Sequence, residues 1–307
     1  MATDNILRSY GDVSRKEDVV LNAVEMLTAS ETMILNMLPK TVAIDTIHSY
    51  LVDTMSVGAT KAVAETGDYA AGTITTPTRL TNIVENIAVP FKVSRTQRLV
   101  EHYQGQDELA RQTEKAVKEW ANAAEFDLVR STLTSGASGT VPKMSGIIEA
   151  TSTAGNHTSH TSGTVWSATI LDGLMSDNWD NSNGDVATDL FMGSILRKNT
   201  DAFTQKSNVV VNAPGMTSIV RTVSSYETAF GTLMIHKHRY IQDAADATAR
   251  VLAIRPEKLA VAYLEKPSID TDLARSGDYD FRAVKGKMTL EVRNQDSNFY
   301  ADGFLKA

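Results

Sequence analysis

The chain has 307 residues, of which 42% are hydrophobic, so it can bury a large core and is not globally disordered. Its formal net charge of −7 argues against a protein whose main task is to grip nucleic acid or an anionic membrane through bulk charge. The absence of cysteine excludes disulfides, thiolate metal sites and cysteine nucleophiles.

The N-terminal segment predicts a polar arm followed by a helix. Residues 1–17 are polar and lack the apolar centre of a secretory signal, and no later apolar run approaches the roughly 20 residues of a transmembrane helix. Residues 18–38 have helical character, with a break expected near 28–30 and an end before Pro39. The apolar stripe of so short a helix could be buried on its own domain or on a neighbouring subunit. We expect a soluble chain made in a cytoplasm, without membrane contact.

The next segment predicts a long two-stranded projection. Residues 44–56 are β-branched and extended in character, and residues 57–79 are rich in Gly, Ala and Thr. Residues 80–93 return as a strand, in which the apolar side chains share one parity and Glu85 is the exception. Because a two-stranded hairpin is marginal in isolation, we expect the projection to need a partner surface.

Residues 105–131 predict one long helix. Asp107 is the expected N-cap, and neither Pro nor Gly follows it before Arg130. Glu114 and Lys118 are four residues apart on the expected wet side. The predicted apolar stripe consists of Leu109, Ala116, Val117, Trp120, Ala121, Ala124 and Leu128. Within it, Trp120 is expected to anchor the helix in the core.

The remaining chain predicts a mixed domain of helices and strands. Residues 134–164 read as a long surface loop with at most a short turn or strand at 147–148. A terminal hairpin is expected from 280–284 and 287–293, turned at Lys285-Gly286. Between them we expect helices at 167–179 and 195–203 and strands at 189–192, 209–211, 232–236, 251–254 and 259–264.

Histidines and carboxylates offer little chemistry. His236 and His238 are either two ligands of a weak metal site or two polar residues on the wet face of a strand, and two ligands are too few for the first interpretation. His157 and His160 are expected in the solvated loop. No phosphate-binding, metal or hydrolase motif is present in the sequence, so no catalytic, cofactor or metal residue is predicted.

Charged residues around the projection and before the long helix are better interpreted as contacts between subunits. A mobile tip gives poor support for positioned acid–base chemistry at Asp53, Glu65 and Asp68. The basic stretch lacks the interleaved aromatics of a nucleic-acid patch. The predicted contact residues are Glu65, Asp68, Tyr69, Arg79, Lys92, Arg95 and Arg98.

The order of these parts resembles the tailed-bacteriophage major capsid proteins of the Hong Kong 97-type fold. That fold has an N-terminal arm, an extended loop, a spine helix, an axial domain and returning strands of a peripheral domain. The resemblance is carried by residues 64–97 (AETGDYAAGTITTPTRLTNIVENIAVPFKVSRTQ), 107–129 (DELARQTEKAVKEWANAAEFDLV), 251–267 (VLAIRPEKLAVAYLEKP) and 276–304 (SGDYDFRAVKGKMTLEVRNQDSNFYADGF).

The resemblance implies an α+β fold with a defined division of the chain. The implied parts are an N-terminal arm at 1–45, the extended loop and an adjoining peripheral-domain strand at 46–104, the spine helix and a peripheral-domain loop at 105–165, the axial domain at 166–275 and returning β-strands at 276–307.

The implied function is that of a shell subunit. It would assemble as pentamers and hexamers in the host cytoplasm into the icosahedral head of a virion, enclosing double-stranded DNA without sequence-specific binding. The short segment 1–45 leaves little room for a fused scaffold, so we expect a separate scaffolding protein or none, together with portal and decoration proteins. The alternatives are an encapsulin-like compartment of the same fold and an enzyme with an unrecognised site.

Overall fold

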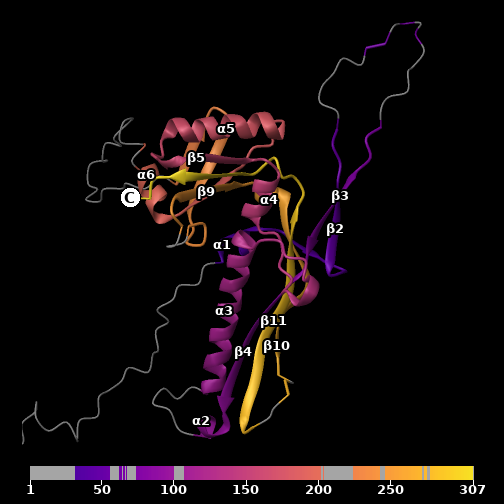
Figure 1. Cartoon of the computed structure of the whole chain (residues 1–307), viewed down its shortest axis with the longest axis vertical. Coiled ribbons are helices and arrows are strands. Elements are labelled where there is room, and N and C mark those ends of the chain that lie inside the picture. Colours follow the sequence, from indigo (N-terminus) through magenta and orange to yellow (C-terminus); the bar gives the residue numbers. More distant parts are fainter. Residues whose placement is uncertain are drawn as a thin grey trace, which may run out of the picture.

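The computed structural model describes residues 32–55, 62–63, 65, 67, 74–99, 107–201, 203, 224–242, 246–271, 273–274 and 277–306. Two sheets and one long helix make up most of the body, and a two-stranded projection extends from it (Figure 1). The long helix lies alongside the narrower sheet, and the wider sheet with its own helices forms the other end of the body (Figure 1). The fold is α+β, as predicted.

The narrower sheet has four strands. In spatial order they are β1 (Lys40–Val42), β10 (Leu259–Asp270), β11 (Tyr279–Val292) and β4 (Glu85–Ser94). β1 is parallel to β10, and the other two pairings are antiparallel. The long helix α3 (Glu108–Arg130) packs against β4 and β11. The short helix α2 (Arg95–Leu99) follows β4 directly.

The wider sheet has six strands. In spatial order they are β5 (His157–Thr164), β12 (Phe299–Phe304), β9 (Ala249–Ile254), β6 (Asp189–Met192), β8 (Gly231–Lys237) and β7 (Ser225–Thr228). The helices of this half are α4 (Ile147–Thr153), α5 (Ala168–Ser182) and α6 (Ser194–Asp201). The predicted range 166–275 therefore contributes β10 to the narrower sheet, and the predicted range 276–307 contributes β12 to the wider one.

The long helix is confirmed almost as predicted. The Asp107 side chain accepts a hydrogen bond from the Leu109 N–H, and Glu114 pairs with Lys118 at 2.7 Å. The predicted stripe is buried or partly buried except at Val117, which is 44% exposed. The helix turns Ala116 and Trp120 into the core, and Val117 lies at the edge of that buried face. The core beneath the stripe contains residues of both sheets, so the two halves share one hydrophobic cluster.

The projection is shorter than predicted. It consists of β2 (Ile47–Val52) and β3 (Thr78–Ile83), which pair antiparallel. The predicted strand 80–93 breaks at Val84, whose N–H donates to the Thr46 carbonyl at 2.8 Å, and its second half is β4 of the narrower sheet. Glu85 is not an exposed exception to the apolar parity, because its side chain is buried beside Met144.

The predicted terminal hairpin is wrong. β11 continues through Lys285 and Gly286, and it pairs with β4 from Tyr279 to Met288. Gly286 serves close packing: a Cβ there would lie 2.6 Å from Cζ2 of Trp120. The absence of a side chain lets the indole of α3 rest on the strand.

The predicted loop 134–164 is also wrong in its second half, where α4 and β5 form. β5 reads as a loop in the sequence because it is built from His, Ser, Thr and Gly, yet its backbone pairs in parallel with β12 at the sheet edge. Helix α1 (Met33–Met37) is the described part of the predicted helix 18–38. The predicted strand 209–211 lies outside the described residues.

Candidate functional site

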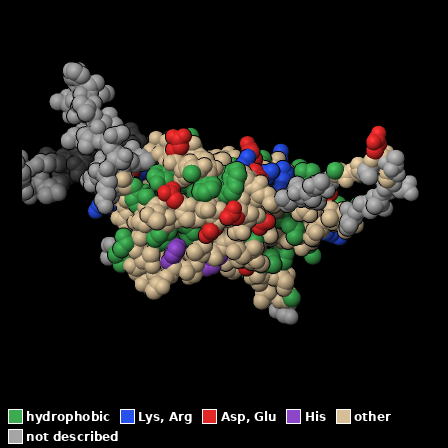
Figure 2. Space-filling model, turned by 90° about the horizontal axis from the view of Figure 1, so that it is seen from above, with side chains coloured by type: hydrophobic (Ala, Val, Ile, Leu, Met, Phe, Trp, Pro, Cys, Tyr) green, Lys and Arg blue, Asp and Glu red, His purple; other side chains and the backbone are tan. Residues whose placement is uncertain are grey.

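Several apolar side chains of the projection and of the segment that leads into it are exposed. Among the described strands β2 and β3 pair only with each other, and Ile47 of β2 is 54% exposed. The most exposed apolar side chains here are Met55 (94%), Ile44 (92%), Ile74 (89%) and Leu51 (70%). In the space-filling view, hydrophobic side chains reach the surface on the body and on the projection (Figure 2).

The two predicted contact residues of the projection that the structure describes, Glu65 and Arg79, are exposed. Arg79 is exposed on β3 and donates to the Ser49 hydroxyl at 2.6 Å across the hairpin. Glu65 is exposed near the tip. Asp68 and Tyr69 lie outside the described residues.

At its root the projection is tied to β11 by Glu291. The carboxylate accepts from the Thr41 hydroxyl at 3.2 Å, lies 3.5 Å from His48 Nε2 and pairs with Arg293 at 2.9 Å. Burial alone would raise the pKa of Glu291, but the bond and charge of Arg293 and the bonds from His48 and Thr41 outweigh it and lower the pKa. Asn82 of β3 adds a bond from its amide to the Leu290 carbonyl at 2.8 Å.

The other predicted contact residues gather where β4 ends and α2 begins. Arg98 pairs with Asp280 of β11 and lies 3.7 Å from Asp107, the N-cap of α3. The Lys92 ammonium lies 4.9 Å and 4.7 Å from the ring centroids of Tyr279 and Phe281.

Arg95 is exposed there, and no described carboxylate pairs with it. Lys92, Arg95 and Arg98 form a basic group at the end of β4 and the start of α2, whereas Arg79 lies on β3. The structure therefore does not bring all the predicted contact residues together.

The sequence prediction missed a buried polar site at Glu125. This carboxylate, on the buried side of α3, accepts from the N–H groups of Ile34 and Leu35 at 2.7 Å each. It also lies 2.9 Å from Nε2 of His238, whose side chain is fully buried. Glu125 thereby caps helix α1 and joins it to α3 and to the end of β8. The one available signal was an acidic residue directly after the apolar Ala124 of the stripe.

The histidines are not on a wet strand face, contrary to the prediction. His236 is half-buried and lies 2.9 Å from Asp189, and His238 follows the end of β8. His157 and His160 lie on β5, where His157 pairs with Asp302 at 3.2 Å. Within the described part of the chain, no cluster of three or more His, Asp or Glu is arranged to hold a metal ion.

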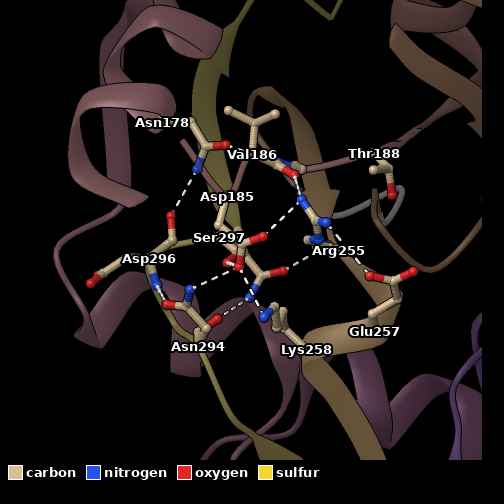
Figure 3. A network of polar contacts seen from close by, with 12 residues as sticks. Asn178, Asp185, Val186, Thr188, Arg255, Glu257, Lys258, Asn294, Asp296 and Ser297 are labelled. Carbon is tan, nitrogen blue, oxygen red and sulfur yellow. Dashed lines mark hydrogen bonds and ion pairs between the residues drawn. The ribbon is translucent and has the colours of Figure 1, made fainter. Parts of the chain in front are cut away.

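A second unpredicted polar site, shown in Figure 3, lies where the chain passes between the two sheets. Asp185 pairs with Arg255 at 2.8 Å and with Lys258 at 3.2 Å, and it accepts from Ser297 at 3.0 Å and Asn294 at 3.2 Å. Burial would raise the pKa of Asp185, but its partners outweigh that effect and hold the pKa below its ordinary range.

Asn178 extends this network from α5. Its side-chain amide donates to the Asp296 carbonyl at 2.8 Å, and its oxygen accepts from the Ala187 N–H at 2.9 Å (Figure 3). The network therefore holds the crossings from β9 to β10 and from β11 to β12 against α5.

The polar sites join elements of one subunit, and the exposed apolar side chains stay uncovered by the rest of the described chain. The SU10 major capsid protein family model matches residues 8–303. The chain belongs to this family. It is therefore a capsid protein and a virion component, and the predicted resemblance to tailed-phage major capsid proteins is confirmed. Sequence comparison with curated proteins finds no match.

Among the similar solved structures are two capsids and an encapsulin complex. The capsid of a native GTA particle has a TM-score of 0.67 at 12% identity, with 96% of this chain and 97% of that chain covered. The capsid of Myoviridae phage XM1 has a TM-score of 0.62 at 11% identity, with 98% of this chain and 100% of that chain covered. The holo-SrpI encapsulin complex from Synechococcus elongatus PCC 7942 has a TM-score of 0.59 at 10% identity, with 97% of this chain and 96% of that chain covered. At these identities the similarity shows the fold alone.

Among the described residues no helix is both long and apolar enough to cross a bilayer.

Proposed function

We propose that this capsid protein assembles as pentamers and hexamers into a closed icosahedral shell around the double-stranded DNA of a tailed phage. The observation that carries the proposal is the projection, whose apolar side chains have no core of their own. Leu51 and Met55 are 70% and 94% exposed, and a neighbouring subunit would remove such surface from water at roughly 25 cal/mol per Å².

The distribution of contact groups supports a tiled arrangement. The projection leaves the body near the wider sheet, and α2 with the basic group lies at the opposite end of the long helix (Figure 1). A subunit in a ring or shell needs at least two different surfaces that fit each other on successive copies. We assign Glu65, Asp68, Tyr69 and Arg79 to the contact of the projection, and Lys92, Arg95 and Arg98 to the contact of the opposite end.

The charge of the chain supports an enclosed genome that is not held by the shell. A net charge of −7 gives no bulk attraction to DNA, so packed DNA would remain free to leave. In this proposal a separate scaffolding protein, a portal and decoration proteins act with the shell during assembly in the host cytoplasm.

Expression of the full chain, alone and with the scaffold of its genome, tests this function. Electron microscopy should show closed particles with five- and six-fold units, and light scattering should show no persisting monomer at high protein concentration. A well-folded monomer under both conditions would contradict the proposal.

The similarity to the encapsulin complex makes a protein compartment the second candidate. In that case particles would form without scaffold and enclose a protein cargo from the host. The nucleic-acid and protein content of purified particles separates the two candidates.

A further inference from the structure

A basic cavity lies between the end of β8, helix α6 and the C-terminal end of the described chain. Helix α6 and the C-terminal end of the chain lie close together in Figure 1. Its volume is about 610 Å³, within the usual range of small-molecule sites. Five cationic side chains line it: Arg197, Lys198, Lys237, Arg239 and Lys306. The described lining contributes one carboxylate, that of Asp201. This excess of positive charge stands out in a chain of net charge −7.

Three of these cations pair with no carboxylate in the described part of the chain. Arg197 lies 3.6 Å from Asp201, and the Lys306 ammonium donates to the Asp246 carbonyl at 2.6 Å. Lys198, Lys237 and Arg239 are exposed at the cavity, and none of them pairs with a described carboxylate. Like charges gathered around one cavity repel each other, so an anion bound between them would stabilise the arrangement.

The inner wall carries further donors. The first turn of α6, beginning after Gly193, lines the cavity, and the first N–H groups of a helix have no partner within it. His238 also lines the cavity, with its side chain fully buried and Nε2 on Glu125. Nδ1 of His238 has no hydrogen-bond partner within the described structure, and it is a donor when the ring carries both protons.

We propose that this cavity binds a phosphate group, free or carried by a nucleotide or a nucleic-acid strand. Three cations without a carboxylate partner among the described residues, together with a helix N-terminus, offer more positive charge and more hydrogen-bond donors than the carboxylate of Asp201 can neutralise or accept. A phosphate group carries up to two negative charges and several acceptor oxygens, so it can pair with these cations and accept from these donors at the same time. The inference goes beyond shell assembly and does not rest on it.

Calorimetric titration of the full-length protein with inorganic phosphate, a nucleoside monophosphate and a short single-stranded oligonucleotide tests the site. The test variant carries Lys198→Gln, Lys237→Gln and Arg239→Gln. The matched control carries Lys115→Gln, Lys118→Gln and Lys266→Gln, which removes the same charge from exposed positions elsewhere. Thermal melting checks that both variants fold, and the single variant Arg239→Gln serves if the triple variant does not.

We expect saturable binding of phosphate ligands that weakens by at least about tenfold in the test variant and by less than about twofold in the control. Tighter binding of the oligonucleotide than of the monophosphate, with a steeper loss in salt, would assign the phosphate to a strand. Equal affinity for the oligonucleotide and the nucleoside monophosphate would assign the bound phosphate to a free nucleotide.

Three results would overturn the proposal. They are no saturable binding of any phosphate probe, equal weakening in the test and control variants, and tighter binding of a glutamate-rich peptide than of any phosphate probe. The last result would assign the cavity to an acidic segment of a protein.

Discussion

Glu85 is a buried carboxylate, and its surroundings disfavour the negatively charged form. Burial raises its pKa above the ordinary value of 4.5, and the negative charge of Asp127 raises it further. Bonds from the Met144 N–H and the Ser131 hydroxyl favour the charged form, but they do not outweigh these effects. The folded protein therefore keeps this proton to a higher pH than the unfolded chain does.

The pH dependence of stability follows from that difference. Below pH 4.5 the carboxyl is protonated in both states, and its contribution to stability is fully present. The contribution falls as pH rises from 4.5 through the raised pKa, because the unfolded chain ionises first. Glu85→Gln is neutral at every pH, so we expect it to be more stable than the natural protein at neutral pH.

Urea unfolding over this pH range measures the effect, and the gain should shrink as pH falls toward 4.5. Glu119→Gln is the control, since Glu119 is an exposed acid on α3. A variant that is less stable than the natural protein at neutral pH would show that Glu85 is stabilising in its charged form.

His238 is the residue whose role changes most between sequence and structure. The sequence favours His236 and His238 as polar residues on the wet face of a strand, whereas the structure buries His238 against Glu125. Removing one partner of a buried pair leaves a charge without compensation, at a cost of about 3–5 kcal/mol. We therefore expect His238→Ala to lower the free energy of unfolding by about that amount in chemical denaturation.

His236→Ala is the matched control for His238→Ala. His236 is half-buried, and its partner Asp189 still reaches solvent, so a loss of about 1 kcal/mol is expected. Equal losses in the two variants would mean that the buried pair contributes no more than the half-buried one.

At the scale of elements, Trp120 fixes the long helix on the narrower sheet. The indole is 4% exposed, its N–H donates to the Ile87 carbonyl at 3.0 Å, and it rests on Gly286. Trp120→Ala should destabilise the subunit by about 3–5 kcal/mol and give unfolded or insoluble protein before any assembly step.

The control for Trp120 comes from the same helix. Val117→Ala, at a 44% exposed position, should change stability by no more than about 0.5 kcal/mol. A soluble Trp120→Ala protein with the natural melting temperature and a defect in assembly alone would place the indole in a subunit contact.

The projection should matter for assembly and not for folding. Leu51→Asp alters a 70% exposed side chain, so we expect a change in subunit stability within about 0.5 kcal/mol and a loss of closed particles in electron microscopy. Val165→Asp makes the same kind of change at a 64% exposed position between β5 and α5, and particles should persist. Normal particle yield from Leu51→Asp would remove this face from the contact.

At the scale of the whole molecule, we expect the two sheets to unfold as one unit because they share a core and a polar junction. The first core cluster contains Leu252 of the wider sheet and Leu290 of the narrower one. Asp185 binds both crossings between the sheets through Arg255 and Ser297. Its lowered pKa means that this stabilisation is present above its ordinary value of 3.8 and is lost as pH falls through the lowered value.

Asp185→Asn should therefore lower the free energy of unfolding at neutral pH by about 1.5–3 kcal/mol, the usual range for charge-assisted bonds. Hydrogen exchange should quicken at 255–258 and 293–298, while a single thermal transition remains. Asp177→Asn, an exposed acid on α5, is the control. Unchanged exchange in both segments would mean that the apolar core alone holds the junction.

The sequence by itself determined the elements whose signals are local. Asp107 and the apolar spacing that follows it define α3, and the apolar run 189–192 defines β6, because caps and periodicity depend on neighbours a few residues away. The order of these elements also identified the capsid fold.

Tertiary structure decided what depends on residues far apart in the chain. Whether 85–94 belongs to the projection or to a sheet depended on β11, and whether Gly286 turns the chain depended on Trp120. Glu125 and His238 are 113 positions apart, and no local pattern can report that a carboxylate and an imidazole will meet in the same buried place. The physical reason is that burial and pairing are properties of the packed molecule, whereas sequence patterns report only the preferences of one segment.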